Sequence, residues 1–225
     1  MARHEWEARH GKGCYVLSSV RLDKAVKGYD ESLFQTLAVA AKKRPQLRFI
    51  FLAWGTDVAA FRSWIENSGF SRQFILLSPV GKKRLIDYYR SCDIVLDQFT
   101  YGYYGSTALE AASIGKPVLM KLRADQYQAL YDGDAAPVIN CNGETVGQAI
   151  IALTDNAEYR IKKGTEMRDW LIRNHGERKT VPLMLALLRL AADHVPLPRE
   201  LINPLLAEET EEERVYHSRC LKEVS

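Results

Sequence analysis

The residues best suited to chemistry lie between Asp93 and Met120, in the sequence DIVLDQFTYGYYGSTALEAASIGKPVLM. This stretch predicts a buried strand, a loop rich in glycine and tyrosine, a short helix and a second buried strand. Gly105, Ser106 and Thr107 fall at the start of the helix, where free backbone N–H groups and the helix dipole favour an anion. Glu110 follows one turn into the helix, in an apolar setting, and is well placed for a sugar hydroxyl. The pattern predicts a phosphate seat beside a hydroxyl-binding carboxylate; an ordinary strand–helix unit with a glycine turn is the alternative.

A second set of charges lies in the segment after the first predicted strand, SSVRLDKAVKGYDESL. Arg21 and Lys27 stand there, just before a predicted helix. If they face the helix start at Gly105, the two cations would clamp a diphosphate, Arg21 by bidentate hydrogen bonds and Lys27 as a mobile point charge. The alternative is a group of solvated basic residues in a turn, with Lys24 as the third.

The elements that must position these residues follow an α/β pattern. Short apolar runs alternate with longer amphipathic runs, which is typical of a parallel sheet covered by helices on both faces. In such a sheet the site lies beyond the carboxyl ends of the strands, near the point where the strand order reverses. The predicted strands are Cys14–Ser19, Arg48–Ala53, Phe74–Leu77, Asp93–Gln98, Pro117–Lys121 and Pro137–Asn140. The predicted helices are Asp30–Lys43, Asp57–Ser68, Lys82–Ser91, Ser106–Ile114, Glu144–Thr154, Ala157–Asn174 and Val181–His194.

Composition excludes several classes of protein. With 47% hydrophobic and 26% charged residues, the 225-residue chain is an ordinary globular protein rather than a disordered or fibrous one. The net charge of +3 is small and the basic residues are scattered, so we expect no nucleic-acid partner. The four cysteines form no CxxC pair, which indicates free thiols in a reducing compartment. No apolar run is long enough to span a membrane and no signal-peptide core is visible, so we expect no membrane span and a cytoplasmic protein.

The chain is expected to divide into three parts: a charged lead-in at residues 1–13, an α/β domain at residues 14–194 and a C-terminal extension at residues 195–225. The extension carries an acidic run from Glu208 to Glu213 and predicts a final helix near residues 207–222. An acidic run of this kind is expected as a solvated helix face, and a docking segment for another domain is the alternative.

Taken together, RLDKAVKG and the later GYYGSTALEAASIGKPVL resemble the C-terminal, donor-binding domain of GT-B glycosyltransferases, in particular the retaining family 4, glycosyl transferases group 1. The resemblance covers about residues 14–190. It implies one GT-B half, a Rossmann-like, doubly wound parallel sheet of six strands with a helical C-terminal extension. It also implies that Arg21 and Lys27 hold the nucleotide diphosphate and that Glu110 binds the ribose. By the same resemblance, the phosphates meet the backbone amides of Gly105, Ser106 and Thr107.

The sequence departs from the family pattern at one position. The family usually carries a second glutamate eight residues before the ribose ligand, in contact with the donor sugar, and Gly102 stands there. DQFTYGYYG resembles a subgroup with a DQ pair and an aromatic loop instead, which makes Gln98 and Tyr103 candidates for sugar contacts. In the family, the loop after the third strand recognises the base through backbone groups and an apolar side chain, so Pro79 and Val80 are the candidates for base binding.

The resemblance implies the nucleotide-sugar-binding half of a retaining glycosyltransferase that transfers a hexose-type sugar to an acceptor hydroxyl. We expect it to need an N-terminal acceptor domain, in a longer protein or as a separate subunit, and to be inactive alone. No His or Cys cluster has metal-ligand spacing, and we expect no metal and no cofactor other than the substrate nucleotide diphosphate sugar. A nucleotide-binding or scaffolding domain without transferase activity is the alternative, favoured by Gly102. A nucleotide-sugar epimerase is a further one, against which the lack of a nearby His or paired acids counts.

Overall fold

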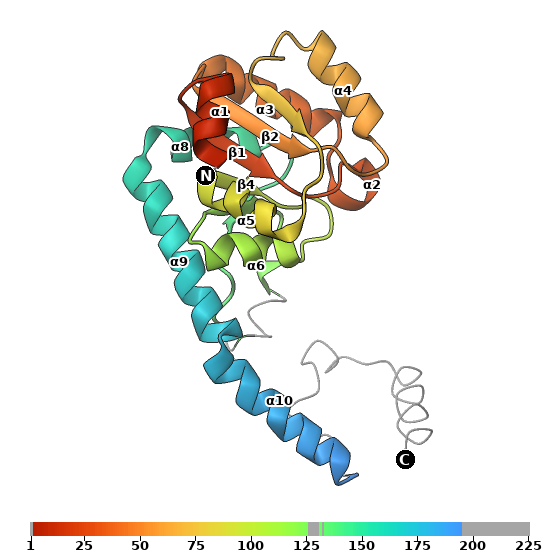
Figure 1. Ribbon diagram of the computed structural model, residues 1–225, viewed down its shortest axis with the longest axis vertical. Helices are drawn as coiled ribbons and strands as arrows, with labels where there is room; N and C mark the ends of the chain where they lie inside the picture. Colours follow the sequence, from red (N-terminus) through yellow and green to blue (C-terminus); the bar gives the residue numbers. More distant parts are fainter. Residues whose placement is uncertain (1, 126–130, 132, 195–225) are drawn as a thin grey trace. The chain divides into compact units, whose positions relative to one another are not determined.

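The short apolar runs of the sequence form one parallel sheet of six strands in the order β3-β2-β1-β4-β5-β6 (Figure 1). The computed structural model describes residues 2–125, 131 and 133–194. The predicted Rossmann-like, doubly wound fold is confirmed, and β4 and β5 are shorter at both ends than predicted. The strands are β1 Cys14–Ser18, β2 Leu47–Leu52, β3 Phe74–Leu77, β4 Ile94–Leu96, β5 Val118–Met120 and β6 Ile139–Asn140.

The seven predicted helices between residues 30 and 194 are present, with ends that differ from the prediction by a few residues, and the described residues also form two short helices that were not predicted. Aspartates begin two of the helices: the Asp30 carboxylate accepts the Leu33 N–H at 3.0 Å, and that of Asp23 accepts the Val26 N–H at 2.8 Å. The helices are α1 Ala2–His10, α2 Lys24–Lys27, α3 Glu31–Lys43, α4 Val58–Asn67, α5 Lys82–Ser91, α6 Ser106–Ser113, α8 Val146–Asp155, α9 Ala157–His175 and α10 Glu177–Ala192.

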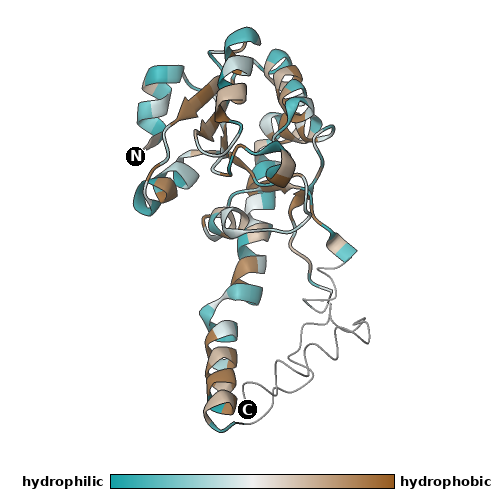
Figure 2. Ribbon diagram, turned by 90° about the vertical axis from the view of Figure 1, so that its right-hand side faces the viewer, coloured by the Kyte–Doolittle hydropathy of each residue, from teal (hydrophilic) through white to brown (hydrophobic). Residues whose placement is uncertain are grey.

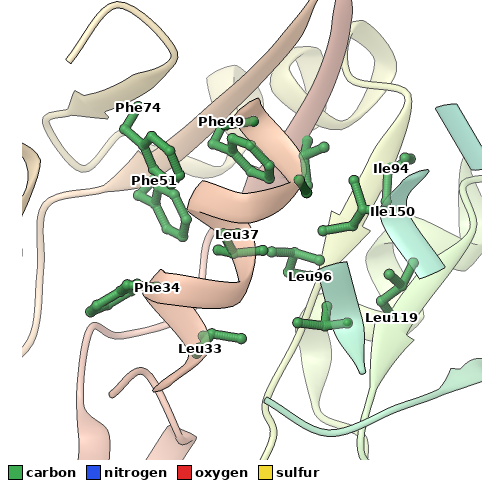
Figure 3. Close-up of a cluster of buried hydrophobic side chains, with 14 of the residues drawn as sticks. Leu33, Phe34, Leu37, Phe49, Phe51, Phe74, Ile94, Leu96, Leu119 and Ile150 are labelled. Carbon is green, nitrogen blue, oxygen red and sulfur yellow. The ribbon is translucent and has the colours of Figure 1, made fainter. Parts of the chain in front are cut away.

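The main core lies between one face of the sheet and the helices α3, α4 and α8 (Figure 3). Phe34 of α3 stacks on Phe61 of α4 at 4.3 Å, and Phe61 meets Phe51 of β2 edge-on at 4.7 Å. Phe49 of β2 stacks on Phe74 of β3 with ring centroids 4.7 Å apart. Helices α1, α5 and α6 pack on the other face (Figure 1). Both faces of the sheet are thus covered, which agrees with the apolar colour of the strands in Figure 2.

Residues Ala2–His10 form a helix, α1, in the part of the chain expected to be a charged lead-in. Trp6 of α1 is 4% exposed. Its ring stacks on that of Tyr15 of β1, with centroids 5.4 Å apart, and lies tilted against that of Tyr88 of α5, with centroids 5.1 Å apart. The Arg3 guanidinium pairs with the Asp93 carboxylate at 2.8 Å. One large apolar residue among many charged ones gives no visible period, which is why the helix escaped prediction. The four-residue α2 was missed because it is too short to carry a period.

The chain separates into two units, the first made of residues 1–123 and 137–171 and the second of residues 124–136 and 172–225. The sheet belongs to the first unit. In the second, Asp134 pairs with Arg173 at 3.1 Å and accepts the Asn174 side-chain amide at 2.8 Å. Helix α10 of this unit has no buried residue. The predicted boundaries at residues 13 and 194 stay a prediction, and the predicted final helix at 207–222 lies outside the described residues.

The strand order reverses between β1 and β4, which pair directly through Val16 and Ile94, Leu17 and Val95, and Ser18 and Leu96. The connection from β1 turns towards β2, and the connection from β4 turns towards β5. The loops that follow these two strands therefore run in opposite directions from the carboxyl ends of the strands. Ligands bind at this point of the sheet in folds of this class.

Candidate functional site

The end of β1 is tied to the start of α6 by hydroxyl groups. Ser19 Oγ lies 2.6 Å from the Tyr89 hydroxyl and 3.3 Å from Thr107 Oγ1. Trp54 Nε1 donates to the Ser19 carbonyl at 2.9 Å, and so fixes the same turn from the loop after β2. The segment that begins at Ser19 and the helix that begins beside Thr107 thus converge.

Helix α2 brings Lys27 to the loop after β4. The Lys27 carbonyl accepts the Phe99 N–H at 2.9 Å. Gly28 ends the helix with a φ of +73°, and a Cβ there would stand 2.7 Å from Thr100 Oγ1. Only glycine adopts this backbone conformation freely and permits so close an approach. Lys27 is partly buried, whereas Arg21 is exposed earlier in the same segment.

The residue that precedes α6 has no side chain to cap it. Gly105 stands there in an extended conformation. Gly105 and Ser106 are exposed and Thr107 is partly buried. The backbone N–H groups of Gly105 and Ala108 hydrogen-bond to the buried Asp97 carboxyl. A helix start presents backbone donors and the positive end of the helix dipole to an anion.

Glu110 is held by a partner that the sequence did not reveal. Its carboxylate forms an ion pair with Lys82 Nζ, and the side chain of Glu110 is 19% exposed while that of Lys82 is 63% exposed. Lys82 opens α5, where the helix dipole disfavours a cation, so the residue gains nothing from its own helix. A lysine in the first turn of a helix is unfavourable there, and this is the one local sign in the sequence of a partner on another element.

The amide of Gln98 organises the loop that follows β4. Its Oε1 accepts the N–H groups of Thr100 at 2.9 Å and Tyr101 at 2.8 Å. Its Nε2 donates to the carbonyls of Tyr103 and Lys121, both at 2.9 Å. Both donors and the acceptor oxygen are engaged, and Gln98 is 2% exposed. A direct contact between Gln98 and a sugar, as the resemblance suggested, would have to break this network.

Gly102 lies in the loop with a φ of +78°. A Cβ at this position would stand 2.7 Å from Cγ of Arg123, and the Gly102 carbonyl accepts the Arg123 N–H at 2.9 Å. The glycine that replaces the family glutamate is therefore required by the conformation of this loop. Beside it, Tyr103 is 41% exposed and lies under the Arg123 guanidinium, 5.9 Å from the ring centroid.

The loop after β3 carries Pro79, which is exposed, and Val80, which is partly buried. A shallow pocket of about 450 Å³ follows this loop. It is lined by Gly81, Lys82, Lys83, Arg84 and Asp87. Lys82 borders the pocket and also contacts Glu110. This lysine of α5 thus follows the loop predicted to bind a base and contacts the α6 residue predicted to bind the ribose.

The thiols of Cys14 and Cys92 are buried, and burial lowers their reactivity. Burial raises the pKa of the Cys14 thiol to about 11 and that of Cys92 to about 12, so these thiols are poor nucleophiles. Among the described residues no cluster of His, Cys, Asp or Glu is suited to a metal ion. Within the same residues, no helix is both long and apolar enough to cross a bilayer.

The sequence of residues 3–161 matches the family glycosyl transferases group 1. This chain belongs to that family. The family assignment agrees with the sheet order, with the residues gathered at the switch point and with the resemblance seen in the sequence. No curated protein matches this glycosyltransferase chain.

Solved glycosyltransferases share the fold of this group 1 chain. A complex of S. aureus TarM with fondaparinux, alpha-GlcNAc-glycerol and UDP superposes with a TM-score of 0.62 at 16% identity, over 78% of this chain and 35% of TarM. The C-terminal domain of the group 1 protein LpcC from Francisella tularensis gives 0.59 at 18% identity, over 77% of this chain and 92% of that domain. Sucrose-phosphate synthase from Thermosynechococcus elongatus gives 0.65 at 14% identity, over 86% and 49%. The chain thus spans about a third of TarM and half of the synthase, and its fold is that of one half of a GT-B enzyme.

Proposed function

We propose that this chain is the nucleotide-sugar-binding half of a retaining glycosyltransferase that transfers a hexose-type sugar to an acceptor hydroxyl. The acceptor domain would belong to the same longer protein or to a separate subunit. The diphosphate contacts Arg21, Lys27 and the amides at the start of α6, and the ribose contacts Glu110. The base lies against Pro79 and Val80.

One observation carries this proposal: the Ser19–Thr107 contact at 3.3 Å, at the switch point of the sheet. It holds the basic segment after β1 beside the start of α6, which begins after a glycine. Cations on one side and the positive end of the helix dipole on the other form a seat for a polyanion, and Glu110 lies one turn further along the same helix. The UDP that accompanies TarM, a chain with the same fold, supports a nucleotide diphosphate as that polyanion.

The mechanism follows from the charge that develops. The nucleotide diphosphate leaves the anomeric carbon through an oxocarbenium-like transition state, and the acceptor hydroxyl attacks from the same face. Arg21, Lys27 and the α6 amides stabilise the negative charge that grows on the leaving diphosphate without needing a metal ion. Loss of one such group would raise the barrier by about 2–4 kcal/mol, by analogy with the removal of one oxyanion-hole donor.

Isothermal titration calorimetry with UDP, GDP and ADP tests the site. Replacing Arg21 or Lys27 by Ala removes a charge-assisted hydrogen bond, and we expect affinity for the tightest of the three nucleotides to fall about 10- to 100-fold. Replacing Lys24 by Ala is the matched control, because this exposed lysine lies in the same segment. Glu110→Ala should weaken binding of the nucleotide and leave its 2′,3′-dideoxy form unaffected. Unchanged affinity in all three site variants would refute the assignment.

A second function is favoured by Gly102, which leaves the loop without the acidic group that contacts the donor sugar in the family. The chain would then be a nucleotide-binding or scaffolding domain with no transferase activity. Assay of the chain together with its acceptor domain distinguishes the two: nucleotide binding without release of sugar from any nucleotide sugar supports the scaffold, and sugar transfer supports the enzyme.

A further inference from the structure

Asp97 is a buried acid directly after β4, and its carboxyl interacts with backbone N–H groups at the start of α6. The residue is 3% exposed, and its Oδ2 has no hydrogen-bond partner among the described residues. Its main chain is held firmly: the Asp97 N–H donates to the Leu119 carbonyl at 3.0 Å, and the Tyr29 hydroxyl donates to the Asp97 carbonyl at 2.7 Å. A buried carboxylate oxygen without a donor is costly, and such a group in a native fold requires an explanation.

The groups around Asp97 have opposite effects on the pKa of its carboxyl. Burial raises the pKa of the Asp97 carboxyl, while the backbone N–H groups of Gly105 and Ala108 and the charge of Lys27 lower it, and burial prevails. Lys27 is the cation whose charge acts on the carboxyl, and Tyr29, whose hydroxyl bonds to the Asp97 carbonyl, is a neighbouring titratable group. Burial also raises the pKa of Tyr29 far above its ordinary value, so Tyr29 stays neutral.

The groups that favour the ionised form of Asp97 are the same groups that the proposed function assigns to the diphosphate. Lys27 and the Gly105 amide would turn their charge and their hydrogen bond towards the phosphate oxygens. The phosphate would also bring negative charge next to the carboxylate, and two anions at short range disfavour each other in a poorly solvated site. Both changes raise the pKa of the Asp97 carboxyl and favour its protonated form.

We propose that Asp97 takes up a proton from solvent when a nucleotide diphosphate binds at the start of α6. The proton occupies the buried carboxyl, which leaves Lys27 and the α6 amides to the diphosphate. This inference rests on the proposed function, because it needs the diphosphate in that seat. It assigns Asp97 as a positioning residue that acts through Lys27 and α6, without touching the sugar.

The sign of the pH effect follows from proton linkage. The bound state holds one more proton than the free state at every pH between the Asp97 pKa of the free protein and the higher pKa of the complex. The association constant therefore falls as pH rises through this window, by up to about tenfold per pH unit for one proton. Below the window Asp97 is protonated in both states and contributes no pH dependence.

Calorimetry in buffers of different ionisation enthalpy at one pH counts the protons taken up, with the tightest-binding of UDP, GDP and ADP as the probe. We expect the wild type to take up more protons than Asp97→Asn, with a difference approaching one proton. The titration of the nucleotide itself cancels in this difference. Asp97→Asn should also bind the nucleotide more tightly than the wild type at the alkaline end of the window. Asp155→Asn, an exposed acid paired with Arg44, is the matched control and should take up protons as the wild type does.

Equal proton uptake by the wild type and Asp97→Asn would overturn this inference while leaving the nucleotide site in place. Failure of the wild type to bind any of the three nucleotides would overturn the proposed function, and this inference with it. If Asp97→Asn does not fold, infrared difference spectroscopy on the wild type decides. Nucleotide addition should then produce a protonated-carboxyl band, and its absence would refute the proton uptake.

Discussion

Gly102→Glu restores, on paper, the carboxylate that the family carries eight positions before Glu110, and we expect it to damage the loop. Gly102 has a φ of +78°, a conformation that costs a residue with a side chain about 1–2 kcal/mol. The new Cβ would meet Arg123 Cγ at 2.7 Å and the Arg123 backbone nitrogen at 3.2 Å. Overpacking of this kind costs about 1–3 kcal/mol. The total of about 2–5 kcal/mol is a large part of the stability of a typical domain.

Urea denaturation separates the two parts of this cost. Gly102→Asn keeps most of the overpacking and lowers the backbone cost, since Asn tolerates the left-handed region better than other residues with side chains. Gly102→Ala combined with Arg123→Ala removes the contact with Cγ and keeps the backbone cost, so we expect the double variant to lose less stability than the sum of its single changes.

Two results would refute the reasoning about Gly102. The first is a Gly102→Glu variant whose unfolding free energy equals that of the wild type. The second is a gain of affinity for a nucleotide sugar over the matching nucleotide in that variant, because it would mean that a carboxylate reaches the sugar from this position without disturbing the loop.

Two further predictions concern the same loop and its neighbour. Gln98→Glu has the shape of Gln98 but lacks the donors to the Tyr103 and Lys121 carbonyls. Leaving an acceptor unpaired costs about 1–3 kcal/mol when it is buried, so the urea midpoint of this variant should fall clearly. An unchanged midpoint would show that the network does not hold the loop. Lys82→Gln breaks a largely exposed ion pair, so stability should change by less than about 1 kcal/mol. Nucleotide affinity should nevertheless fall several-fold in calorimetry, because Glu110 loses the group that orients it, whereas Lys83→Gln should bind as the wild type; equal affinities in both variants would exclude this role.

The sheet was predictable because each strand is a short, continuous apolar run between turn residues, the pattern of a strand buried on both faces. β3 was placed to the residue, since Phe74 and Leu77 are bounded by polar residues on both sides. β4 and β5 were predicted too long. After β4, Asp97 and Gln98 are as buried as the strand, and the Gln98 side chain bonds to the following loop, which hydropathy does not register.

The site was predictable where its chemistry depends on local sequence. A glycine before a helix start and a carboxylate one turn later are features of neighbouring residues, and α6 begins at Ser106 as expected. The partners were not predictable, because they come from distant elements. Lys82 reaches Glu110 from another helix, and the amide of Gln98 bonds to the Lys121 carbonyl on the next strand connection. These pairings exist only once the sheet has assembled.

Under the proposed function, the loop after β4 would contact a sugar with neutral groups. A carboxylate at position 102 conflicts with the backbone, and the amide of Gln98 is consumed by the loop itself. The polar side chains that this loop exposes are the hydroxyls of Tyr101, 50% exposed, and Tyr103, 41% exposed. Hydrogen bonds to a neutral hydroxyl contribute about half as much as those to a charged group. Under the proposed function, the energy of donor binding then comes mainly from the diphosphate and the ribose, and discrimination among sugars depends on the shape of a loop whose conformation Gln98 fixes.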